Sequence, residues 1–476
     1  MQEKYDVIVV GMGPSSIFCA YELIQLKKYK KVLLIDQGKR VENRCCPIEK
    51  TKKCIHCKPM CNITNGFSGA GAFSDGKLSL YNPKDEDIHV GGNLHKYIGV
   101  PKTKELIDYA DKIYLDFGAD KKLEGTEYQE EIAKISERAE KDGVKLINIP
   151  IRHLGTEKSH EVYGRLEKYI EDNGIEMMFN TTVMDLIVED AEIKGVKIKE
   201  AKYIDDENYP VDSIFAEKVV LAVGRKGANW LVEMCNKHNI KTDTGIVDIG
   251  VRYELPDEVM KDVNKYMYEA KFKGRVGPFR DKVRTFCQNP SGFVSAEVYD
   301  NNLTLVNGHS YKERKSTNTN LAILVSHHFT HPFDKPIGYG RNVAQNLNDL
   351  GAGNIVVQRL GDIYRGKRTW DYELENNSVI PTLKSAVAGD ITFALGYRTM
   401  VSILEFIRAI DKVVEGFGHP DNLLYAPEIK FYSNKVIINE QFETSIKGLY
   451  SIGDGGGMTR GLMMASCSGI QMARNL

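Results

Sequence analysis

The first forty residues combine an extended apolar pattern with a helical one. Residues 7–10 are an unbroken apolar run, Val-Ile-Val-Val, which is typical of a strand buried on both faces of a parallel sheet. From Pro14 to about Lys28, apolar residues return at helical spacing. A second apolar run covers residues 32–35. The pattern therefore predicts a strand, a helix and a second strand in close succession.

The alternation of helical and extended patterns continues to about residue 245. Helical stripes occur at 103–142 and 161–172, and extended runs occur at 144–147, 176–179, 182–188, 193–199 and 219–223. After residue 245 the character changes, because residues 251–381 mix extended segments with loops and show no strand–helix repeat. A long amphipathic helix follows within 381–418, and an extended run at 448–454 precedes a last helix.

A chain of 476 residues is too long for one simple core, so two or three domains are expected. The pattern favours an α/β protein. We expect residues 1–245 to form the first part of a domain that is discontinuous in sequence, with a helical excursion at about 100–142. We expect residues 246–380 to form an inserted α+β substrate domain. Residues 381–476 contain a helical segment and the return to the first domain.

The turn after the first strand carries the clearest chemical signal. Gly11-x-Gly13-x-x-Ser16 separates strand from helix, and Asp36 ends the second strand. The glycines allow a tight turn and close approach of the backbone to a pyrophosphate, and an acidic side chain at that position accepts hydrogen bonds from a ribose. We therefore expect a dinucleotide here, with NAD and FAD both open. The candidate contacts are Gly11, Gly13, Pro14, Ser15, Ser16, Asp36, Gln37 and Gly38.

The amino-acid composition and net charge argue against some classes of function. Hydrophobic and charged residues make up 42% and 27% of the chain, as in ordinary globular proteins. The formal net charge is −1, which argues against a nucleic-acid partner held by bulk positive charge. We expect no membrane span and no signal peptide before the first strand. The expected location is the cytoplasm, where the nine cysteines are thiols or ligands rather than disulfides.

Two features follow the second strand. Arg44 offers a cation that could neutralise a dinucleotide phosphate, or it is a solvated surface arginine. Residues 65–78 are rich in glycine, alanine and serine, which suits a backbone that lies flat against a planar ligand. The candidate contacts in this loop are Ser68, Gly69, Ala70, Gly71, Ser74 and Asp75.

Five of the nine cysteines lie within 17 residues, between Cys45 and Cys61. Thiolates at this spacing are compatible with a zinc ion, an iron–sulfur cluster, a redox-active pair or a loop of inert thiols. The candidate ligands are Cys46, Cys54, Cys57 and Cys61, because Cys45 points elsewhere in an extended backbone.

The C-terminal strand, residues 448–454, ends in Gly453-Asp454 and is followed by glycines and a helix from near Arg460. A carboxylate here suits ribitol hydroxyls, and a helix N-terminus suits the flavin N1–C2=O edge. Together with the motif at residue 11, this ending favours FAD over NAD. It predicts a Rossmann-like FAD-binding domain that is discontinuous in sequence. The candidate contacts are Gly453, Asp454, Arg460, Gly461 and Leu462.

Two further glycine pairs, Gly338-x-Gly340 and Gly351-x-Gly353, lack the strand–turn–helix context of a second nucleotide fold. A separate NAD(P)H domain is therefore not expected. Electrons would come from a small reductant, from a partner protein or from nicotinamide bound transiently.

Several stretches resemble a family of FAD-dependent dehydrogenases in the glutathione-reductase-like flavoprotein superfamily. They are Gly11-x-Gly13-Pro14, Asp36-x-Gly38, GFSGAGAFSDGKLS from residue 66 and GLYSIGDGGGMTRGLMMASCSG from residue 448. The resemblance extends nearly end to end. It implies that the glycine-rich loop approaches the flavin, that Val183 meets the adenine, and that the strand ending at Ala222 and Gly224 passes beside the dinucleotide. Some relatives lack the cysteine cluster, which makes it an accessory feature.

Catalytic candidates come from the inserted segment. The stretch around Cys287 resembles a family segment that often carries a second cysteine where this chain has Asn289. His309 and Arg314 offer acid–base and anion-binding groups, or they belong to a polar hairpin. The favoured function is an FAD-dependent oxidoreductase acting on a small organic molecule. The alternatives are a flavin-dependent biosynthetic or macromolecule-modifying enzyme, or a flavoprotein redox sensor that uses the cysteine cluster.

Overall fold

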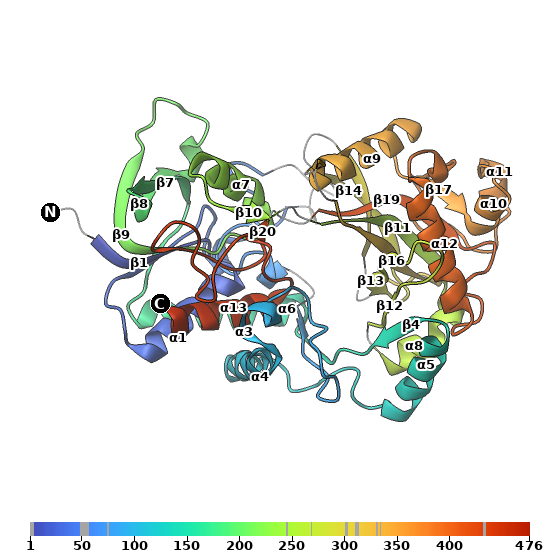
Figure 1. The fold of residues 1–476 in the computed structure, drawn as a ribbon, viewed down its shortest axis with the longest axis horizontal. Helices are drawn as coiled ribbons and strands as arrows, with labels where there is room; N and C mark the ends of the chain where they lie inside the picture. Colours follow the sequence, from blue (N-terminus) through green and yellow to red (C-terminus); the bar gives the residue numbers. More distant parts are fainter. Residues whose placement is uncertain are drawn as a thin grey trace. The chain divides into compact units, whose positions relative to one another are not determined.

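The computed structural model describes residues 4–47, 57–73, 76–243, 246–267, 269–299, 303–309, 314–329, 332–333, 335–431 and 435–476. The chain forms two compact units, each with its own sheet (Figure 1). Unit 1 comprises Met1–Leu123, Pro150–Asp243 and Ser433–Leu476. Unit 2 comprises Glu124–Ile149 and Thr244–Tyr432.

The sheet of unit 1 is parallel at its centre. Its core order is β6-β2-β1-β9, with β21 also pairing with β9, and all of these strands run parallel. The antiparallel hairpin of β7 and β8 extends the sheet beyond β9. The strands are β1 (Lys4–Val10), β2 (Val32–Ile35), β6 (Glu176–Met178), β7 (Thr181–Glu189), β8 (Glu192–Glu200), β9 (Asp212–Leu221) and β21 (Leu449–Ser451). Residues 7–10 of β1 are buried, as the unbroken apolar run predicts.

Helices from both ends of the chain meet in unit 1. Gly469 of α13 lies so close to α1 that a side chain there would overlap the backbone oxygen of Ser15. The helices are α1 (Pro14–Leu26), α3 (His95–Ile98), α4 (Val100–Asp116), α6 (Gly155–Asp172), α7 (Ala228–Lys237) and α13 (Leu462–Asn475). Short pieces are β3 (Lys77–Ser79), β5 (Ile151–His153), β10 (Thr242–Asp243), β20 (Lys435–Val436), η1 (Val41–Asn43), η2 (Gly71–Phe73), η3 (Ala201–Tyr203) and η4 (Arg225–Gly227).

Unit 2 is built on a sheet of order β18-β17-β19-β11-β16-β13-β12-β4, antiparallel except for the pair β17–β18. The strands are β4 (Val144–Ile147), β11 (Val247–Pro256), β12 (Lys271–Gly274), β13 (Val283–Asn289), β16 (Asn318–His327), β17 (Val356–Arg359), β18 (Val387–Ala388) and β19 (Leu423–Phe431). A separate hairpin pairs β14 (Phe293–Tyr299) with β15 (Leu303–His309).

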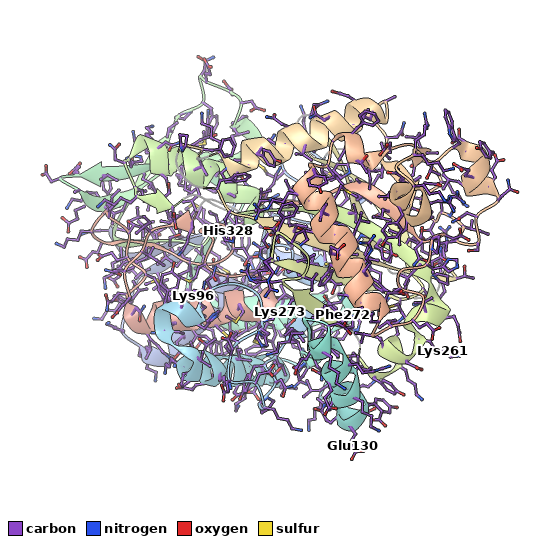
Figure 2. The ribbon with its side chains drawn as sticks, turned by 45° about the vertical axis from the view of Figure 1, so that its right-hand side comes forward. Lys96, Glu130, Lys261, Phe272, Lys273 and His328 are labelled. Atoms are coloured by element: carbon purple, nitrogen blue, oxygen red, sulfur yellow. The ribbon has the colours of Figure 1, made fainter. Side chains whose placement is uncertain are left out.

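The helices of unit 2 are α5 (Gln129–Lys141), α8 (Lys261–Tyr266), α9 (Pro336–Leu350), α10 (Leu360–Tyr364), α11 (Asp371–Glu375) and α12 (Tyr397–Asp411), with 3₁₀ turns η5 (Asp257–Met260) and η7 (Ile391–Phe393). Phe406 and Ile407 of α12 share one hydrophobic core with β11 and β16. Figure 2 shows Glu130 and Lys261 extending away from this unit, whereas Phe272 of β12 is buried in the core. Among the helices in the described part of the chain, none is long and apolar enough to cross a membrane.

The limits of unit 2 differ from those expected from sequence. The expected inserted domain ended at residue 380, whereas unit 2 continues to Tyr432 and also includes Glu124–Ile149. The reason is packing: α12 buries its apolar face in the core of unit 2, and β19 lies beside β11 in the middle of its sheet. The helical excursion at 100–142 is likewise divided between units, with α4 in unit 1 and α5 in unit 2. An amphipathic pattern indicates that a helix buries one face, but it does not indicate which unit's core that face packs against.

Candidate functional site

The turn between β1 and α1 leaves the start of the helix open. Gly11 has a φ of +98°, and a Cβ at this residue would lie 2.8 Å from the carbonyl oxygen of Ala222. Gly13 is the N-cap of α1 and provides no side-chain cap, and a Cβ there would meet no described atom within 4 Å. Pro14 occupies the first turn. The N-terminus of α1 is therefore accessible to an anion.

Asp36 connects three backbone segments. Its Oδ2 accepts a hydrogen bond from the N–H of Met12 at 2.9 Å, and its Oδ1 accepts from Gly38 at 2.8 Å and Gly66 at 2.7 Å. Burial raises the pKa of this carboxyl, while the three N–H donors and the charge of Arg44 oppose that rise. Since a carboxylate has about four acceptor positions, roughly one remains, on Oδ2, for a ligand hydroxyl. Asp36 thus organises the site in addition to the ribose contact that its position predicts.

Arg44 is 3% exposed and uses all five guanidinium N–H groups within the protein. They donate to the carbonyl oxygens of Asn62, Ile63, Phe67 and Gly69 and to the hydroxyl of Ser68. The guanidinium also lies 4.7 Å from the ring centroid of Phe73. Burial lowers the pKa of Arg44 to about 10. The side chain is neither a solvated surface group nor a free phosphate ligand; it shapes the glycine-rich loop.

That loop lies directly against the β1–α1 turn. The N–H of Ser68 donates to the carbonyl of Met12 at 2.8 Å, and a Cβ on Gly69 would lie 3.3 Å from the Cα of Gly13. A Cβ on Gly71 would lie 2.9 Å from the ring of Tyr163. Small residues are therefore needed here because of close packing on both sides. Ala70 is exposed, whereas Ser74 and Asp75 lie outside the described residues.

The C-terminal segment approaches the same turn. Gly453 has a φ of +78°, and a Cβ there would lie 2.7 Å from the hydroxyl of Ser15. The N–H of Gly455 donates to the carbonyl of Val223 at 3.0 Å. Val223 lies between Ala222 and Gly224, just after the end of β9, so the C-terminal segment lies beside that end of the strand. Segments that are 440 residues apart in sequence therefore form one cluster of glycines.

Asp454 and Gly461 lie shortly before the last helix, α13. The hydroxyl of Thr459 donates to Oδ1 of Asp454 at 2.8 Å. Burial raises the pKa of Asp454, and this rise is opposed by the charges of Arg225 and Arg460 and by the N–H of Gly461. Gly461 is the N-cap of α13, immediately before Leu462, and supplies no side-chain cap. As at Gly13, a Cβ there would meet no described atom within 4 Å.

The structure describes the surroundings of three further residues that the sequence predicts as cofactor contacts. The amide of Gln37 donates to Oδ1 of Asn65 at 2.6 Å, at the start of the glycine-rich loop. The hydroxyl of Ser16 is buried and has no hydrogen-bond partner among the described residues. Val183 of β7 is 6% exposed and belongs to the hydrophobic core with Ile8 and Leu33.

The catalytic candidates all lie in unit 2. Cys287 has a φ of +44° at an irregularity in the pairing of β13 with β16, and its carbonyl accepts from Nη1 of Arg252 at 2.7 Å. His309 pairs with Phe293 across the β14–β15 hairpin, and the guanidinium of Arg314 lies 4.4 Å from the Phe293 ring centroid. His309 and Arg314 therefore both lie next to Phe293: His309 is opposite it in the hairpin, and Arg314 is against its ring.

Sequence reasoning missed a buried polar network in unit 2. Arg252 and Glu428 are both fully buried, with Nε and Oε2 3.1 Å apart, and Nη2 of Arg252 donates to Asn307 at 2.9 Å. Glu254 accepts hydrogen bonds from Asn318, Thr382 and Tyr425, and burial raises its pKa. The sequence of β11 indicated that polar side chains share one face of this strand. Apolar residues 247, 249, 251, 253 and 255 alternate there with a polar set that includes Asp248, Arg252 and Glu254.

The cysteine cluster lies only partly within the described residues, since Cys54 is outside them. Cys46, Cys57 and Cys61 are free thiols. Burial raises the pKa of Cys61, but hydrogen bonds from Ile63 and Thr64 and the charge of Lys226 outweigh it, so that the pKa lies below its ordinary value. Within the described ranges, no group of three or more His, Cys, Asp or Glu residues is placed to hold a metal ion.

Residues 247–430 match a family model described as "FAD-dependent protein, C-terminal domain-like". The matched segment lies within unit 2. Unit 2 is thus similar to a domain of FAD-dependent proteins. A protein of Clostridium beijerinckii named "Uncharacterized protein" is 25% identical over 496 aligned positions, which cover 99% of this chain and 81% of the relative.

Solved structures show more distant similarity. Pyridoxine 4-oxidase from Mesorbium loti aligns with a TM-score of 0.43 and 9% identity, over 99% of this chain and 99% of that chain. L-Proline dehydrogenase from P. horikoshii aligns with a TM-score of 0.38 and 12% identity, over 100% and 93%. At these scores the two structures decide neither the fold nor the chemistry of this chain.

Proposed function

We propose that this protein is an FAD-dependent oxidoreductase that acts on a small organic molecule. In this proposal unit 1 is a Rossmann-like FAD-binding domain that is discontinuous in sequence, and unit 2 is the inserted substrate domain. The family match of residues 247–430 supports the class. The main support for FAD as the cofactor comes from the N-termini of α1 and α13 in unit 1. At both, the N-cap glycine has open space where a side chain would project.

The residues of unit 1 fit FAD. A pyrophosphate suits the open N-terminus of α1 at Gly13, and the acceptor position left on Asp36 suits a ribose hydroxyl. The N-terminus of α13 at Gly461 suits a group that becomes negative on reduction, and Asp454 suits the ribitol hydroxyls. The buried Ser16 hydroxyl, in the first turn of α1, adds a polar group that has no hydrogen-bond partner among the described residues. When bound, FAD supplies hydride or electron transfer.

Gly13 provides the sharpest test, because its side-chain position is empty. In Gly13→Ala the new methyl group meets no described protein atom, so unit 1 should remain folded, while the methyl occupies the space proposed for the pyrophosphate. We expect FAD affinity to fall by about tenfold or more, which is about 1.4 kcal/mol. Affinity is measured by titrating FAD into deflavinated full-length protein and following flavin fluorescence.

Gly164→Ala is the matched control, since Gly164 lies within α6 and also has open space at its side-chain position. This variant should bind FAD as the parent does. Purified parent protein should be yellow, with the absorbance of oxidised flavin. A colourless protein that cannot be reconstituted with FAD, or equal FAD affinity in Gly13→Ala and the parent, would contradict the proposal.

We assign the three catalytic candidates of unit 2 roles in this oxidoreductase reaction. His309 and Arg314 are proposed as proton-transfer and anion-binding groups, and Cys287 as a redox-active thiol. Candidate electron donors are a small reductant, a partner protein and transiently bound NAD(P)H. Anaerobic mixing with each donor, followed by flavin absorbance, identifies the one that bleaches the flavin. Loss of this bleaching in His309→Gln, with unchanged FAD content, would support a role in the chemistry.

We also propose Cys46, Cys54, Cys57 and Cys61 as ligands of zinc or of an iron–sulfur cluster, separate from the flavin chemistry. Elemental analysis of protein purified without oxygen or chelator tests this. Stoichiometric zinc or iron supports the proposal. Absence of both metals, with all four thiols titratable, would reduce the cluster to a cysteine-rich loop.

A further inference from the structure

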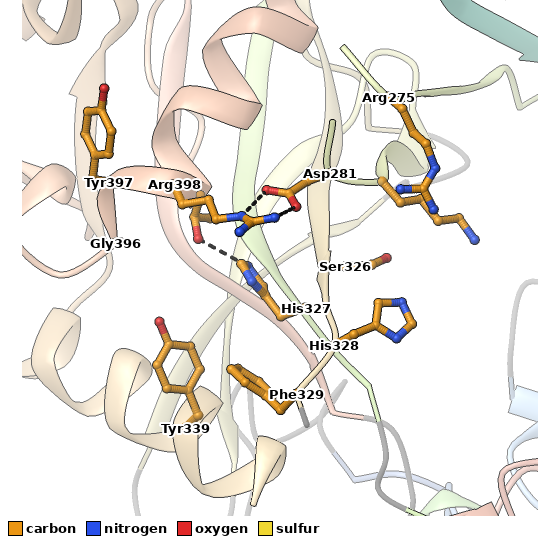
Figure 3. A pocket seen from close by; sticks show the side chains of 12 residues that line it. Arg275, Asp281, Ser326, His327, His328, Phe329, Tyr339, Gly396, Tyr397 and Arg398 are labelled. Carbon is orange, nitrogen blue, oxygen red and sulfur yellow. Dashed lines mark hydrogen bonds and ion pairs between the residues drawn. The ribbon is translucent and has the colours of Figure 1, made fainter. Parts of the chain in front are cut away.

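Unit 2 contains a cavity of about 460 Å³ that none of the predicted site residues line (Figure 3). It is formed where the end of β16, the first turn of α12 and residues from the β12–β13 connection meet, with α9 contributing Tyr339. The volume lies in the range of small-molecule sites, which is roughly 300–1,000 Å³. Its size therefore suits a small organic ligand.

The charged side chains of the cavity are mainly cationic. Arg275, Lys282 and Arg398 line it, together with one carboxylate, Asp281. Arg398 forms a two-point ion pair with Asp281, at 2.8 Å from Nε and 2.5 Å from Nη2. Arg275 donates instead to a neutral group, the carbonyl oxygen of Arg280, at 3.0 Å. The carboxylate is therefore already paired with Arg398, and the charge of Arg275 is not balanced by that contact.

The first turn of α12 adds to this positive character. Gly396 is the N-cap of α12, has no side-chain cap and lines the cavity with Tyr397, Arg398 and Thr399. The helix continues to Asp411, so its N-terminal dipole is that of a helix of 15 residues. Backbone N–H groups and cationic side chains thus border one cavity. This combination favours a ligand with a carboxylate or phosphate group.

Flat side chains form another part of the lining. Figure 3 shows Phe329 beside Tyr339, and their ring centroids are 5.1 Å apart. The imidazole of His327 lies nearly parallel to the Phe329 ring, at 18° and 6.4 Å between centroids. His327 is held by a hydrogen bond of 3.1 Å between Nε2 and the hydroxyl of Thr399, and burial lowers its pKa. Such surfaces favour a planar ring in the ligand.

We propose that this cavity binds a planar organic anion, namely an aromatic or heteroaromatic ring that carries a carboxylate or a phosphate. The ring packs against the Phe329–Tyr339 wall, and the anionic group is attracted by the positive charge of the lining, to which Arg275 and the start of α12 both contribute. The site goes beyond the proposed function and does not rest on it, because all lining residues belong to unit 2 and all proposed FAD contacts belong to unit 1.

Four probes distinguish the two anion types and test the role of the ring. Benzoate is compared with cyclohexanecarboxylate, which lacks the planar ring, and AMP is compared with ribose 5-phosphate, which lacks the base. Isothermal titration calorimetry is performed on full-length protein saturated with FAD, so that AMP does not compete for an empty FAD site. We expect benzoate or AMP to bind about tenfold more tightly than its partner probe. Whichever does so identifies a carboxylate or a phosphate ligand.

Variants assign the binding to the cavity. Arg275 is exposed, so Arg275→Gln should fold normally and weaken the tighter probe by about tenfold. Tyr339→Leu should weaken benzoate or AMP but leave the non-planar partner unchanged. Lys384→Gln, a change of an exposed lysine elsewhere in unit 2, is the matched control and should leave affinity unchanged. Absence of binding by all four probes, equal affinity within both pairs, or an Arg275→Gln affinity equal to that of the parent would overturn the proposal. Flavin absorbance, recorded separately, reports on FAD binding alone.

Discussion

The two units place their polar chemistry in different ways. In unit 1, the proposed cofactor site consists mainly of backbone: glycines, open N–H groups and short turns, with Asp36 and Arg44 holding that backbone in place. In unit 2, the polar centre consists of side chains, with the buried pair of Arg252 and Glu428 at the middle of the sheet. One unit therefore depends on the absence of side chains, and the other depends on particular side chains.

The type of sheet explains the difference. Strand β1 lies between parallel neighbours and is apolar on both faces over residues 7–10, so polar groups gather where the strands end. Strand β11 lies between antiparallel neighbours and alternates apolar with polar residues, which directs one polar row into the unit. A Cβ added at a closely packed glycine should therefore damage unit 1, and removal of a buried charge should damage unit 2.

The chain offers a separate reporter for each unit, because its two tryptophans are Trp230 in unit 1 and Trp370 in unit 2. In a Trp370→Phe background, urea unfolding followed by tryptophan fluorescence reports on unit 1. In a Trp230→Phe background, it reports on unit 2. Each variant below is compared with its own background, so that a change is assigned to one unit.

Arg252→Met should have the largest effect. It leaves the fully buried Glu428 without its arginine, with Lys430 at 2.7 Å as the remaining cation, and should lower the free energy of unfolding of unit 2 by about 3–5 kcal/mol. The double variant Arg252→Met/Glu428→Gln should recover much of this loss, because no unpaired charge remains buried. A loss below about 1 kcal/mol in the single variant would show that the pair is not the centre of unit 2.

Arg44→Lys keeps the charge but replaces five fixed donors with three on a flexible stem. The carbonyl groups of Asn62 and Ile63 and those of the glycine-rich loop then lose their common partner. We expect the unfolding free energy of unit 1 to fall by about 2–3 kcal/mol, together with weaker FAD binding. If Arg44 acted only as a charge near a phosphate, the lysine variant would retain both stability and most of the FAD affinity.

Gly11→Ala tests whether unit 1 depends on the absence of a side chain. The residue has a φ of +98°, and the added Cβ would lie 2.8 Å from a backbone oxygen, so we expect a loss of about 2 kcal/mol in the unfolding of unit 1. Gly13→Ala, two residues away, should be close to neutral in the same measurement. Equal effects of the two alanines would remove the distinction between a glycine needed for packing and one needed for the ligand.

Asp362→Asn should have the smallest effect, and it should depend on pH. Burial raises the pKa of Asp362, but hydrogen bonds from Arg359 and Thr369 and nearby cations outweigh it, so the folded-state pKa is depressed. The ionised carboxylate therefore stabilises unit 2 above the unfolded-state pKa of about 3.9, and this contribution is lost as pH falls through the folded-state pKa. We expect a cost of about 1 kcal/mol at neutral pH that shrinks in acid. A difference that is constant between pH 7 and pH 3 would contradict the assignment.

Local pattern predicted several elements closely. The strand–turn–helix–strand order of the first 36 residues agrees with β1, α1 and β2, because unbroken apolar runs and an apolar period of 3.6 are properties of neighbouring residues. The same reasoning did not place the end of unit 2. The amphipathic stripe of α12 is equally compatible with either core, and only contacts with strands such as β16, distant in sequence, assign it to unit 2.

For the candidate site, the sequence by itself determined which positions lack a side chain and where a carboxylate ends a strand: Gly11, Gly13, Asp36, Gly453 and Asp454. Only the tertiary structure decided what these groups face. It directs all five donors of Arg44 into a loop, makes Asp36 a junction of three backbone segments, and brings residues 275–282, 326–329 and 396–399 around one cavity. The physical reason is that periodicity and turn geometry act between neighbours along the chain. Hydrogen-bond partners, charge pairs and cavities depend instead on distances that exist only after the chain has folded.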